Sequence, residues 1–408
     1  MVVPGMESHQ QRPLVVDCSS GAFPAWANDA ELGAVAPAPG LRDTGYQIKM
    51  KPDNFAGTPF SPLPCRVSII IKALNEEACI RTTVESALRA VSTVGGEVIL
   101  ADSFSTDRTV ELASAYPIRI VQLVNAHERR CGAGPQLGYQ HSQGEFVYIL
   151  DGDMRMREGF LGQALAFLGE HSRAAGVGGR VVEHNTESLE YISRAEHAST
   201  YLAPSQVDRL DGGGLYRREA IEAAGYFSDR NLHSYEELDL ATRLRAGGWE
   251  LWRLPLDACD HSGHDAPPYR LLMRRWRTRY VCGLGELIRS ATGEPRLQMI
   301  LRGVRELRIY AAVLLWWLTL ATVPFWPLPA PVRAAAFMGI LAAPVLVMTW
   351  RKRSASKALY SVVSWCFQAA GLLRGFFHAR QPARQAILSR VLHEPARAPL
   401  GGSGGARN

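Results

Sequence analysis

Short apolar runs rich in β-branched residues alternate with helical stretches between residues 66 and 150. Four of these runs are typical of buried strands: Val67–Ile71, Glu97–Ala101, Ile118–Gln122 and Phe146–Leu150. Helices are expected between them, at about residues 76–91, 106–115 and 134–141. Strands that alternate with helices form βαβ units, so we predict an α/β fold with a mostly parallel central sheet. In such a sheet the ligand binds outside the carboxyl ends of the strands.

Acidic side chains follow three of the predicted strands at the points where the strands end. They belong to the groups Asn75-Glu76-Glu77, Asp102 with Asp107, and Asp151-Gly152-Asp153. A further group, Glu236, Glu237 and Asp239, lies later in the chain. Carboxylates gathered at one edge of a sheet repel one another unless they bind a cation or a hydrogen-bonding ligand. The sequence therefore predicts a ligand site at this edge.

Asp151-Gly152-Asp153 is the most informative of these groups. Two carboxylates separated by a glycine, directly after a buried strand, can share a divalent cation in a tight turn. Such oxygen ligands suit Mg²⁺ or Mn²⁺, and the phosphates of a substrate complete the coordination. The tripeptide is also common in solvated surface turns. Its position after Phe146–Leu150 favours the metal site.

The order and spacing of several motifs resemble those of the inverting family-2 glycosyltransferases, which have a GT-A fold. The matching segments, within residues 66–262, are Val67–Ile71, Asn75–Glu77, Leu100–Asp107, Gly132–Gly138, Gly144–Asp153, Gly212–Arg218, Gly225–Phe227 and Glu236–Leu244. The resemblance implies a nucleotide-sugar-binding domain that transfers a sugar to a hydroxyl group with the help of a divalent metal.

The resemblance also implies roles for residues on the donor side of the site. Asp102 would contact the nucleotide base, Asp151 would lie on the ribose or metal side, and Asp153 would bind the metal. The remaining residues expected around the nucleotide sugar are Asn75, Glu76 or Glu77, Arg129, Arg130 and Gln136. Asp107 is expected to cap the helix that follows it.

The general base is expected in the pair Glu236-Glu237, where the resemblance places the base of the family; the family's pair reads Asp/Glu-Asp, and here it is Glu-Glu. Glu237 is the first choice, but either carboxylate can reach an acceptor hydroxyl. Asp239 is expected to be structural. His261 follows at the position where similar enzymes can complete the metal shell, and His264 is a weaker candidate. A lone histidine is more often a hydrogen-bonded structural residue, so both interpretations of His261 stay open.

Two uncharged apolar stretches, Ile309–Leu328 and Ala334–Trp350, follow in the last third of the chain. Each is near the roughly 20 residues that cross a bilayer. The short link between them predicts a transmembrane hairpin, with core helices of a soluble protein as the alternative. A third apolar stretch, Ala358–Phe377, contains Gln368 and Arg374, and we expect it in the membrane interface, although it could also span.

Basic residues flank the hairpin on both sides and predict its orientation. They are Arg302, Arg305 and Arg308 before it, and Arg351, Lys352, Arg353 and Lys357 after it. By the positive-inside rule both flanks, and with them the catalytic domain, lie on the cytoplasmic side of the inner membrane. A net charge of +6 on 408 residues does not indicate nucleic-acid binding.

Together these features divide the chain into five parts. They are a Pro/Gly-rich extension (1–64), the glycosyltransferase domain (65–265), a basic interfacial helical segment (266–308), the transmembrane hairpin (309–350), and an amphipathic or third membrane helix with a basic, flexible tail (351–408). The predicted enzyme moves a sugar from a UDP- or GDP-sugar to a lipid-linked or envelope-polysaccharide acceptor. The alternatives are a polyprenyl-phosphate glycosyltransferase and a non-catalytic membrane scaffold. The sequence does not specify the sugar, the linkage or processivity.

Overall fold

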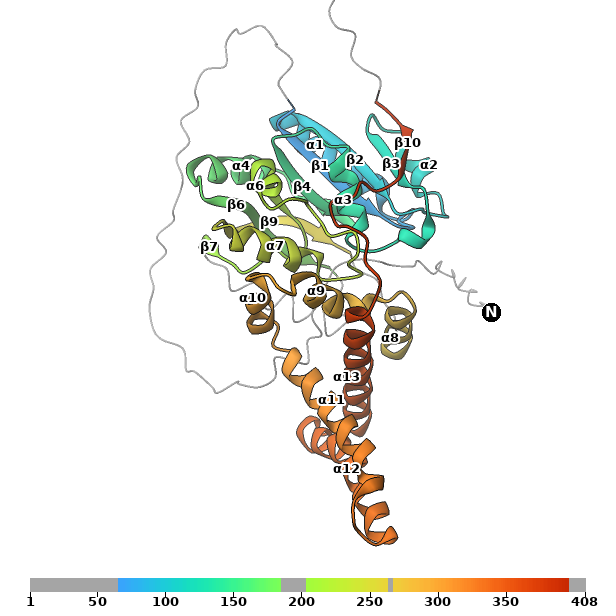
Figure 1. Ribbon diagram of the computed structural model, residues 1–408. Helices are drawn as coiled ribbons and strands as arrows, with labels where there is room; N and C mark the ends of the chain where they lie inside the picture. The colour runs from blue at the N-terminus through green and yellow to red at the C-terminus, as the bar shows by residue number, and fades with distance from the viewer. Residues whose placement is uncertain (1–64, 185–202, 263–266, 396–408) are drawn as a thin grey trace, which may run out of the picture.

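The computed structural model describes residues 65–184, 203–262 and 267–395. These residues form a mixed α/β domain, from which an elongated group of helices projects (Figure 1). The predicted N-terminal extension, His264 and the last residues of the chain lie outside the described residues.

The first half of the sheet is parallel, as the alternation of strands and helices predicts. Its strands are β1 (Val67–Ala73), β2 (Gly96–Asp102), β3 (Arg119–Leu123) and β4 (Phe146–Asp151), in the order β3-β2-β1-β4. The side chains of Ile69, Ile70 and Ile71 are fully buried, which a parallel strand covered on both faces requires. The register pairs Ala73 with Asp102 and Lys72 with Asp151, so these strand ends meet at one edge.

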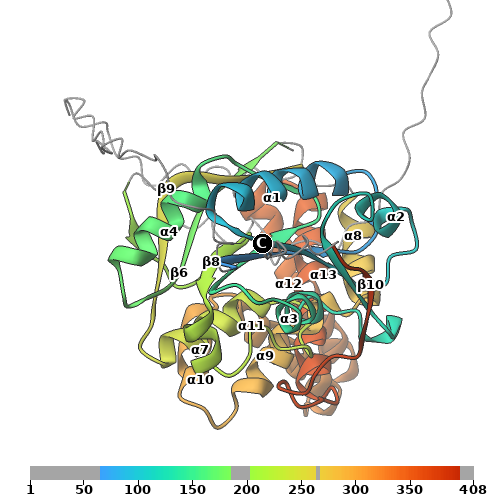
Figure 2. The same ribbon diagram turned by 90° about the horizontal axis from the view of Figure 1, so that it is seen from above.

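Helices cover both faces of the sheet (Figure 2). On one face, α1 (Ile80–Val94), α2 (Thr109–Ala113) and α4 (Phe160–Glu170) share a core with Ile69 and Ile71. On the other, α3 (Ala133–Gln140), α6 (Arg218–Ala223) and α7 (Glu236–Ala246) share a core with Ile70. α3 comes very close to β1 at Gly138, where an added Cβ would lie 2.2 Å from Ile70 Cγ2. The alternation of side chains along β1 thus builds two separate cores.

The second half of the sheet departs from the parallel pattern. β8 (Gly214–Arg217) is antiparallel to both β4 and β6 (Ala174–Glu183), and β9 (Glu250–His261) is parallel to β6. The short strands β5 (Met154–Met156) and β7 (Ser205–Gln206) are antiparallel to β9. Because β5 follows Asp153 directly and its Met154 pairs with His261, the end of β9 lies beside Asp153.

Three short helices connect the catalytic domain to the projecting group. They are α8 (Pro268–Arg277), α9 (Gly283–Ala291) and α10 (Arg296–Gly303), so the segment predicted at 266–308 is helical where it is described. Leu284 and Leu287 of α9 pack with Leu238 of α7 in a third core. Single 3₁₀ turns lie at η2 (Ala126–Glu128), η3 (Tyr280–Cys282) and η4 (Val323–Phe325).

The projecting group consists of α11 (Leu307–Thr322), α12 (Ala330–Lys352) and α13 (Ala355–Phe376). Two helical stretches in the described part of the chain, Leu307–Phe325 and Ala330–Lys352, are long and apolar enough to cross a membrane by length and composition. α13 packs against α9, α11 and α12. Its second half is docked tightly, since a Cβ at Gly375 would lie 2.0 Å from the Cys282 carbonyl oxygen. The corresponding part of the third apolar stretch therefore contacts protein rather than lying free in an interface.

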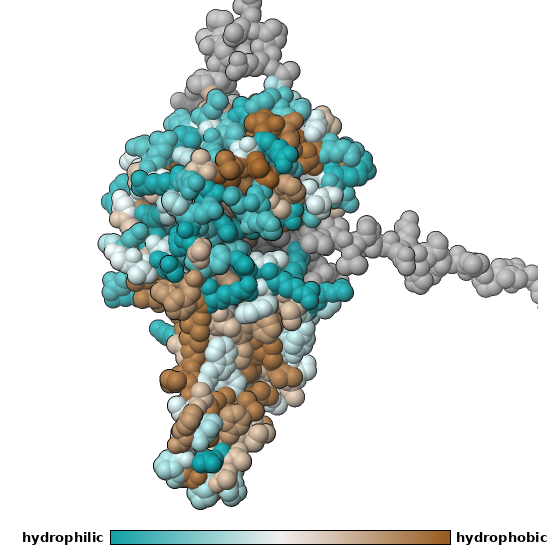
Figure 3. Space-filling model, turned by 45° about the vertical axis from the view of Figure 1, so that its right-hand side comes forward, coloured by the Kyte–Doolittle hydropathy of each residue, from teal (hydrophilic) through white to brown (hydrophobic). Residues whose placement is uncertain are grey.

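Apolar side chains cover the outside of the projecting helices (Figure 3). Exposed examples are Leu315, Leu318, Met338, Leu346 and Val347. Only 17% and 6% of the two apolar windows are buried, whereas a core helix of a soluble protein is mostly buried. The soluble-core alternative does not fit this exposure.

The chain then returns to the catalytic domain, which corrects the prediction of a flexible tail for the described residues. β10 (Ser389–His393) pairs antiparallel with β3 and forms the opposite edge of the sheet from β5. Short, exposed strands of this kind carry little local signal, and their order comes from the strand they pair with.

Candidate active site

The loops after β1 and β2 are hydrogen-bonded to each other at the sheet edge. Asn75, with a φ of 60°, donates its N–H to Ser105 Oγ at 2.9 Å. Its side-chain oxygen accepts the N–H of Thr106 at 2.8 Å. Asn75 therefore shapes the site by joining two loops.

Asp102 is fully buried at the end of β2. Its Oδ2 accepts hydrogen bonds from Ser105 N at 2.9 Å and from Gln122 Nε2 at 2.8 Å. Its Oδ1 is buried and has no hydrogen-bond partner among the described residues. Because buried polar atoms are almost always paired, this oxygen is suited to accept a hydrogen bond from a ligand.

Lys72, the penultimate residue of β1, connects the acidic groups of β4 and α7. Its Nζ lies 2.9 Å from Asp151 Oδ1 and 3.4 Å from Glu236 Oε1. Burial tends to lower the pKa of Lys72, but the neighbouring carboxylates, led by Asp151, raise it well above its ordinary value. A charged lysine therefore holds Asp151 and Glu236 together, although these two acids are 85 residues apart in the chain.

Glu237 is partly buried beside this ion pair, and its Oε1 accepts the N–H of Gly212 at 3.2 Å. Burial raises the pKa of Glu237 to about 8, and the charge of Asp211 adds to the effect, while Lys72 opposes it. A carboxylate with a raised pKa is a stronger base than an ordinary one and is tuned to accept a proton near neutral pH.

Asp153, His261 and Glu183 form a buried chain at the ends of β4, β9 and β6. His261 Nε2 lies 3.1 Å from Asp153 Oδ2, and His261 Nδ1 lies 2.5 Å from Glu183 Oε2. Burial would lower the pKa of His261, but hydrogen bonds with the two carboxylates raise it to about 10. A histidine whose second nitrogen is held by a carboxylate is the common arrangement around metal ions.

The donor set at this point fits a divalent metal that is only partly coordinated by protein. Among the described residues, no group of three or more His, Cys, Asp or Glu side chains is arranged to hold a metal. Asp153 and His261 supply one oxygen and one nitrogen, and Mg²⁺ or Mn²⁺ keeps several waters and binds substrate phosphates. Asp151, the other expected ligand, has its carboxylate paired with Lys72.

Gly152 is required by the packing between the two aspartates. A Cβ at this position would lie 2.7 Å from Glu76 Cγ, so the buried Glu76 lies directly against the turn. Glu77 is exposed on the other side, where its carboxylate accepts the N–H of Arg108 at 3.1 Å. Of the two, Glu76 is thus the buried residue that faces the turn between Asp151 and Asp153.

Two of the three residues expected beside the diphosphate, Arg130 and Gln136, differ in their surroundings. The side-chain oxygen of Gln136 accepts the N–H groups of Phe227 and Ser228, each at 3.0 Å, and so orders that loop. Arg130 has a buried Nε with no hydrogen-bond partner among the described residues. Burial lowers the pKa of its guanidinium. The Nε of Arg130, unpaired in the described part of the chain, therefore has hydrogen-bonding capacity for an anion.

Two further acids are structural, as expected. Asp107 Oδ1 accepts the N–H of Thr109 at the start of α2, at 3.0 Å. Asp239 is fully buried and pairs with Arg243 at 2.9 Å and Arg296 at 2.6 Å. These pairs anchor α7, which carries Glu236 and Glu237.

Sequence reasoning missed Lys72 and Glu183. Lys72 had a local signal, because it is the one charged residue within the apolar run of β1. Glu183 had none, because its role depends on β6 and β9 pairing so that Glu183 lies opposite His261.

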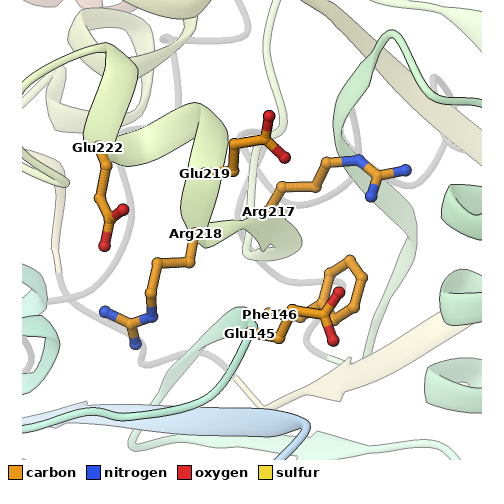
Figure 4. A pocket seen from close by; sticks show the side chains of 6 residues that line it. All are labelled: Glu145, Phe146, Arg217, Arg218, Glu219 and Glu222. Atoms are coloured by element: carbon orange, nitrogen blue, oxygen red, sulfur yellow. The ribbon is translucent and has the colours of Figure 1, made fainter.

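A pocket elsewhere in the domain lies away from these residues (Figure 4). Its lining residues are Glu145, Phe146, Arg217, Arg218, Glu219 and Glu222. Phe146 begins β4, whereas Asp151 ends it. The pocket is therefore at the opposite end of the strand from the acidic edge.

Comparisons with known proteins agree with this geometry. Residues 68–225 match the family model described as glycosyl transferase family 2. No curated protein matches the chain. A mannosyltransferase from Pyrobaculum calidifontis, solved in complex with GDP-Man and Mn²⁺, is 19% identical, with a TM-score of 0.50 over 78% of this chain and 91% of that one.

S. aureus TarS is also similar, at 17% identity and a TM-score of 0.42 over 56% of this chain and 44% of that one, so this chain spans less than half of its length. A TarS fragment of residues 1–349 in complex with UDP-GlcNAc is 14% identical, with a TM-score of 0.43 over 77% of this chain and 93% of that one. Taken with the sheet and its acidic edge, these comparisons show that residues 68–225 are similar to glycosyl transferase family 2 and that the domain has the GT-A fold.

Proposed function

We propose that the chain is a membrane-anchored, metal-dependent, inverting glycosyltransferase that moves a sugar from a UDP- or GDP-sugar to a hydroxyl group. The observation that carries this proposal is the junction at Lys72. This one lysine joins Asp151 on the predicted donor side to Glu236, the neighbour of the predicted base. Donor and base functions therefore fall within one cluster of side chains.

The nucleotide would bind across the loops after β1 and β2. Asp102 Oδ1, buried and unpartnered among the described residues, would accept an N–H of the base. Arg130 would contact the diphosphate, because its buried Nε lacks a partner in the described structure and an anion would satisfy it. Asp151, held by Lys72, would lie on the ribose side.

Glu237 is the better candidate for the general base. Glu236 is the acid of the pair that contacts the Lys72 ammonium directly, with 3.4 Å between Lys72 Nζ and Glu236 Oε1. Glu237 is not the direct partner of Lys72 and has a pKa raised to about 8. It would accept the proton of the acceptor hydroxyl as the hydroxyl oxygen attacks the anomeric carbon, a contribution of about 10²–10⁴-fold.

Asp153 and His261 would hold the divalent metal, Mn²⁺ or Mg²⁺. Glu183 would keep the His261 ring in place through Nδ1, at the 2.5 Å contact described above. When bound, the metal would stabilise the negative charge that grows on the departing nucleotide diphosphate. The expected role of Asp151 as a second carboxylate ligand would require it to leave Lys72.

The projecting helices support attachment to a membrane. Apolar side chains face outward on α11 and α12, and in α12, which the structure describes in full, no residue is buried. The basic residues at both ends of the pair support a cytoplasmic catalytic domain at the inner membrane. α11 and α12 would span, with α13 returning the chain to the catalytic domain.

This location favours a lipid-linked acceptor or an envelope polysaccharide. A polyprenyl phosphate is the alternative acceptor, and product analysis with polyprenyl phosphate separates the two. A non-catalytic scaffold is the remaining alternative. The grouping of Glu237, with its raised pKa, beside Lys72, Asp151 and Glu236 favours an enzyme, because perturbed carboxylates are concentrated at functional sites.

The test is a donor screen on the full chain in lipid nanodiscs, with UDP- and GDP-sugars and MnCl₂. Turnover is expected with one donor, and both Asp153→Ala and Glu237→Gln should abolish it. Glu219→Gln is the matched control, because Glu219 is an exposed carboxylate in the pocket of Figure 4, away from the acidic edge. Full turnover in both site variants would defeat the assignment of these residues.

A further inference from the structure

The segment after α13 crosses the catalytic domain before it joins the sheet (Figure 1). Asn231 and Gln381 bind each other through two backbone groups of Gln381, each at 2.9 Å. Gln140 binds Ile387 in the same way, at 2.8 and 3.2 Å, and the Ile387 side chain is buried in the core. This segment is therefore fixed to the domain along its length.

Strand β10 brings Arg390 opposite Gln122 of β3. Residues that are directly opposite in an antiparallel pair lie on the same face of the sheet, within reach of each other. Gln122 is the residue that donates to Asp102 Oδ2 at 2.8 Å and so orients the buried carboxylate. Arg390 is thus the strand partner of the residue that hydrogen-bonds to Asp102.

Arg390 also reaches the loop that follows Asp102. Its guanidinium carbon lies 6.0 Å from the ring centre of Phe104, and that of Arg129 lies 5.5 Å from the same ring. Phe104 has a φ of 68°, a conformation that is unfavourable for a bulky side chain. Such a conformation persists only where neighbouring groups hold it. Arg129 further binds the Ser103 carbonyl oxygen at 3.0 Å.

We propose that β10 is part of the nucleotide-binding site and that Arg390 is a positioning residue for the nucleotide. This inference rests on the proposed function, in which Asp102 and the following loop contact the base. Arg390 acts through Phe104 and Gln122, and it holds the loop in its binding conformation before the nucleotide arrives. Preorganisation of this kind strengthens binding because less loop ordering remains to be done on association.

The inference also connects the membrane helices to the donor site. The segment that ends in β10 starts at the end of α13, and α13 packs against α11 and α12. The family match covers residues 68–225, so Arg390 lies well beyond it. A nucleotide-binding contribution from this position would therefore come from outside the segment that matches the family model.

The test compares nucleotide affinity among single variants of the full chain in nanodiscs. UDP and GDP are each titrated by calorimetry in the presence of MnCl₂. Arg390→Ala should weaken binding of the preferred nucleotide about two- to fivefold, the range of a partly exposed cation–π contact. Arg390→Lys should restore much of the affinity. Leu388→Ala is the matched control, since Leu388 is a 71% exposed side chain just before the same strand.

Two further readouts separate positioning from loss of structure. The melting temperature of Arg390→Ala should match that of the wild type, because the Arg390 side chain is exposed. Amide hydrogen exchange in residues 103–106 should be faster in Arg390→Ala and near normal in Arg390→Lys. If Arg390→Ala has the nucleotide affinity and the hydrogen-exchange rates of the wild type, the inference about Arg390 is overturned, but the proposed function is not. A wild-type chain that binds neither nucleotide would overturn the proposed function and this inference with it.

Discussion

Replacing Lys72 by methionine tests the junction on which the site is built. The variant leaves the carboxylates of Asp151 and Glu236 without the cation that lies 2.9 and 3.4 Å away. Removing one partner of a buried ion pair destabilises a protein by about 3–5 kcal/mol. The Lys72 side chain is 13% exposed, so we expect the lower end, about 3 kcal/mol. For a domain of this size that corresponds to a drop in melting temperature of about 6–12 °C.

The assay is chemical and thermal unfolding of the full chain, with Lys357→Met as the control, because Lys357 is an exposed lysine at the start of α13. The double variant Lys72→Met/Asp151→Asn should regain part of the stability, since it removes one of the two carboxylates that Lys72→Met leaves unpaired. Lys72 also lowers the pKa of Glu237, so its loss should move the rise in activity to higher pH. An unfolding free energy equal to that of the wild type would refute the reasoning.

Four other outcomes follow from the site and the helices. The metal-free protein should lose stability as pH rises from about 6.5 to about 10, because the pKa of His261 is raised to about 10 and its ion pairs need the protonated ring. In denaturant titrations, His261→Gln should make the free energy of unfolding less dependent on pH over this range. The same pH dependence in the variant as in the wild type would contradict this prediction. Mn²⁺ affinity, measured by calorimetry, should increase over the same range, since a metal competes with that proton, and a pH-independent affinity would count against His261 as a ligand. Wild-type activity should increase with pH toward about 8 as Glu237 loses its proton. Glu237→Gln should lower kcat by about 10²–10⁴-fold. A kcat of the variant within tenfold of the wild-type value would exclude Glu237 as the base. The full chain should float with lipid vesicles and resist alkaline and high-salt washes, whereas release into the supernatant would rule out α11 and α12 as spans.

The strands of the parallel half, and the residues at their ends, were predictable from the sequence. The run Val67–Ile71 is apolar without interruption, as a strand buried on both faces must be, and β1 contains all of it. Asp102 and Asp151 could be placed at one edge because parallel neighbours end on the same side of a sheet. The two apolar stretches near the end of the chain were equally clear, because each is long enough to cross a membrane.

The antiparallel half of the sheet and β10 were not predictable in this way. Periodicity shows that a segment is a strand, but not which strand it pairs with. β10 is a short strand with exposed apolar side chains, and its place beside β3 comes from contacts made by the whole preceding segment. Residues predicted as a flexible tail are ordered for that reason.

The sequence by itself determined which acidic residues lie at the ends of the strands, because strands follow from local periodicity. It also determined which stretches are long and apolar enough to cross a membrane, because this follows from length and composition. Only the tertiary structure decided that Lys72 holds Asp151 to Glu236, and that Glu183 holds His261 beside Asp153. These contacts join residues that are far apart in the chain. Strand pairing and helix packing decide which of these residues are neighbours. The sequence around a charged residue does not indicate which opposite charge it will pair with.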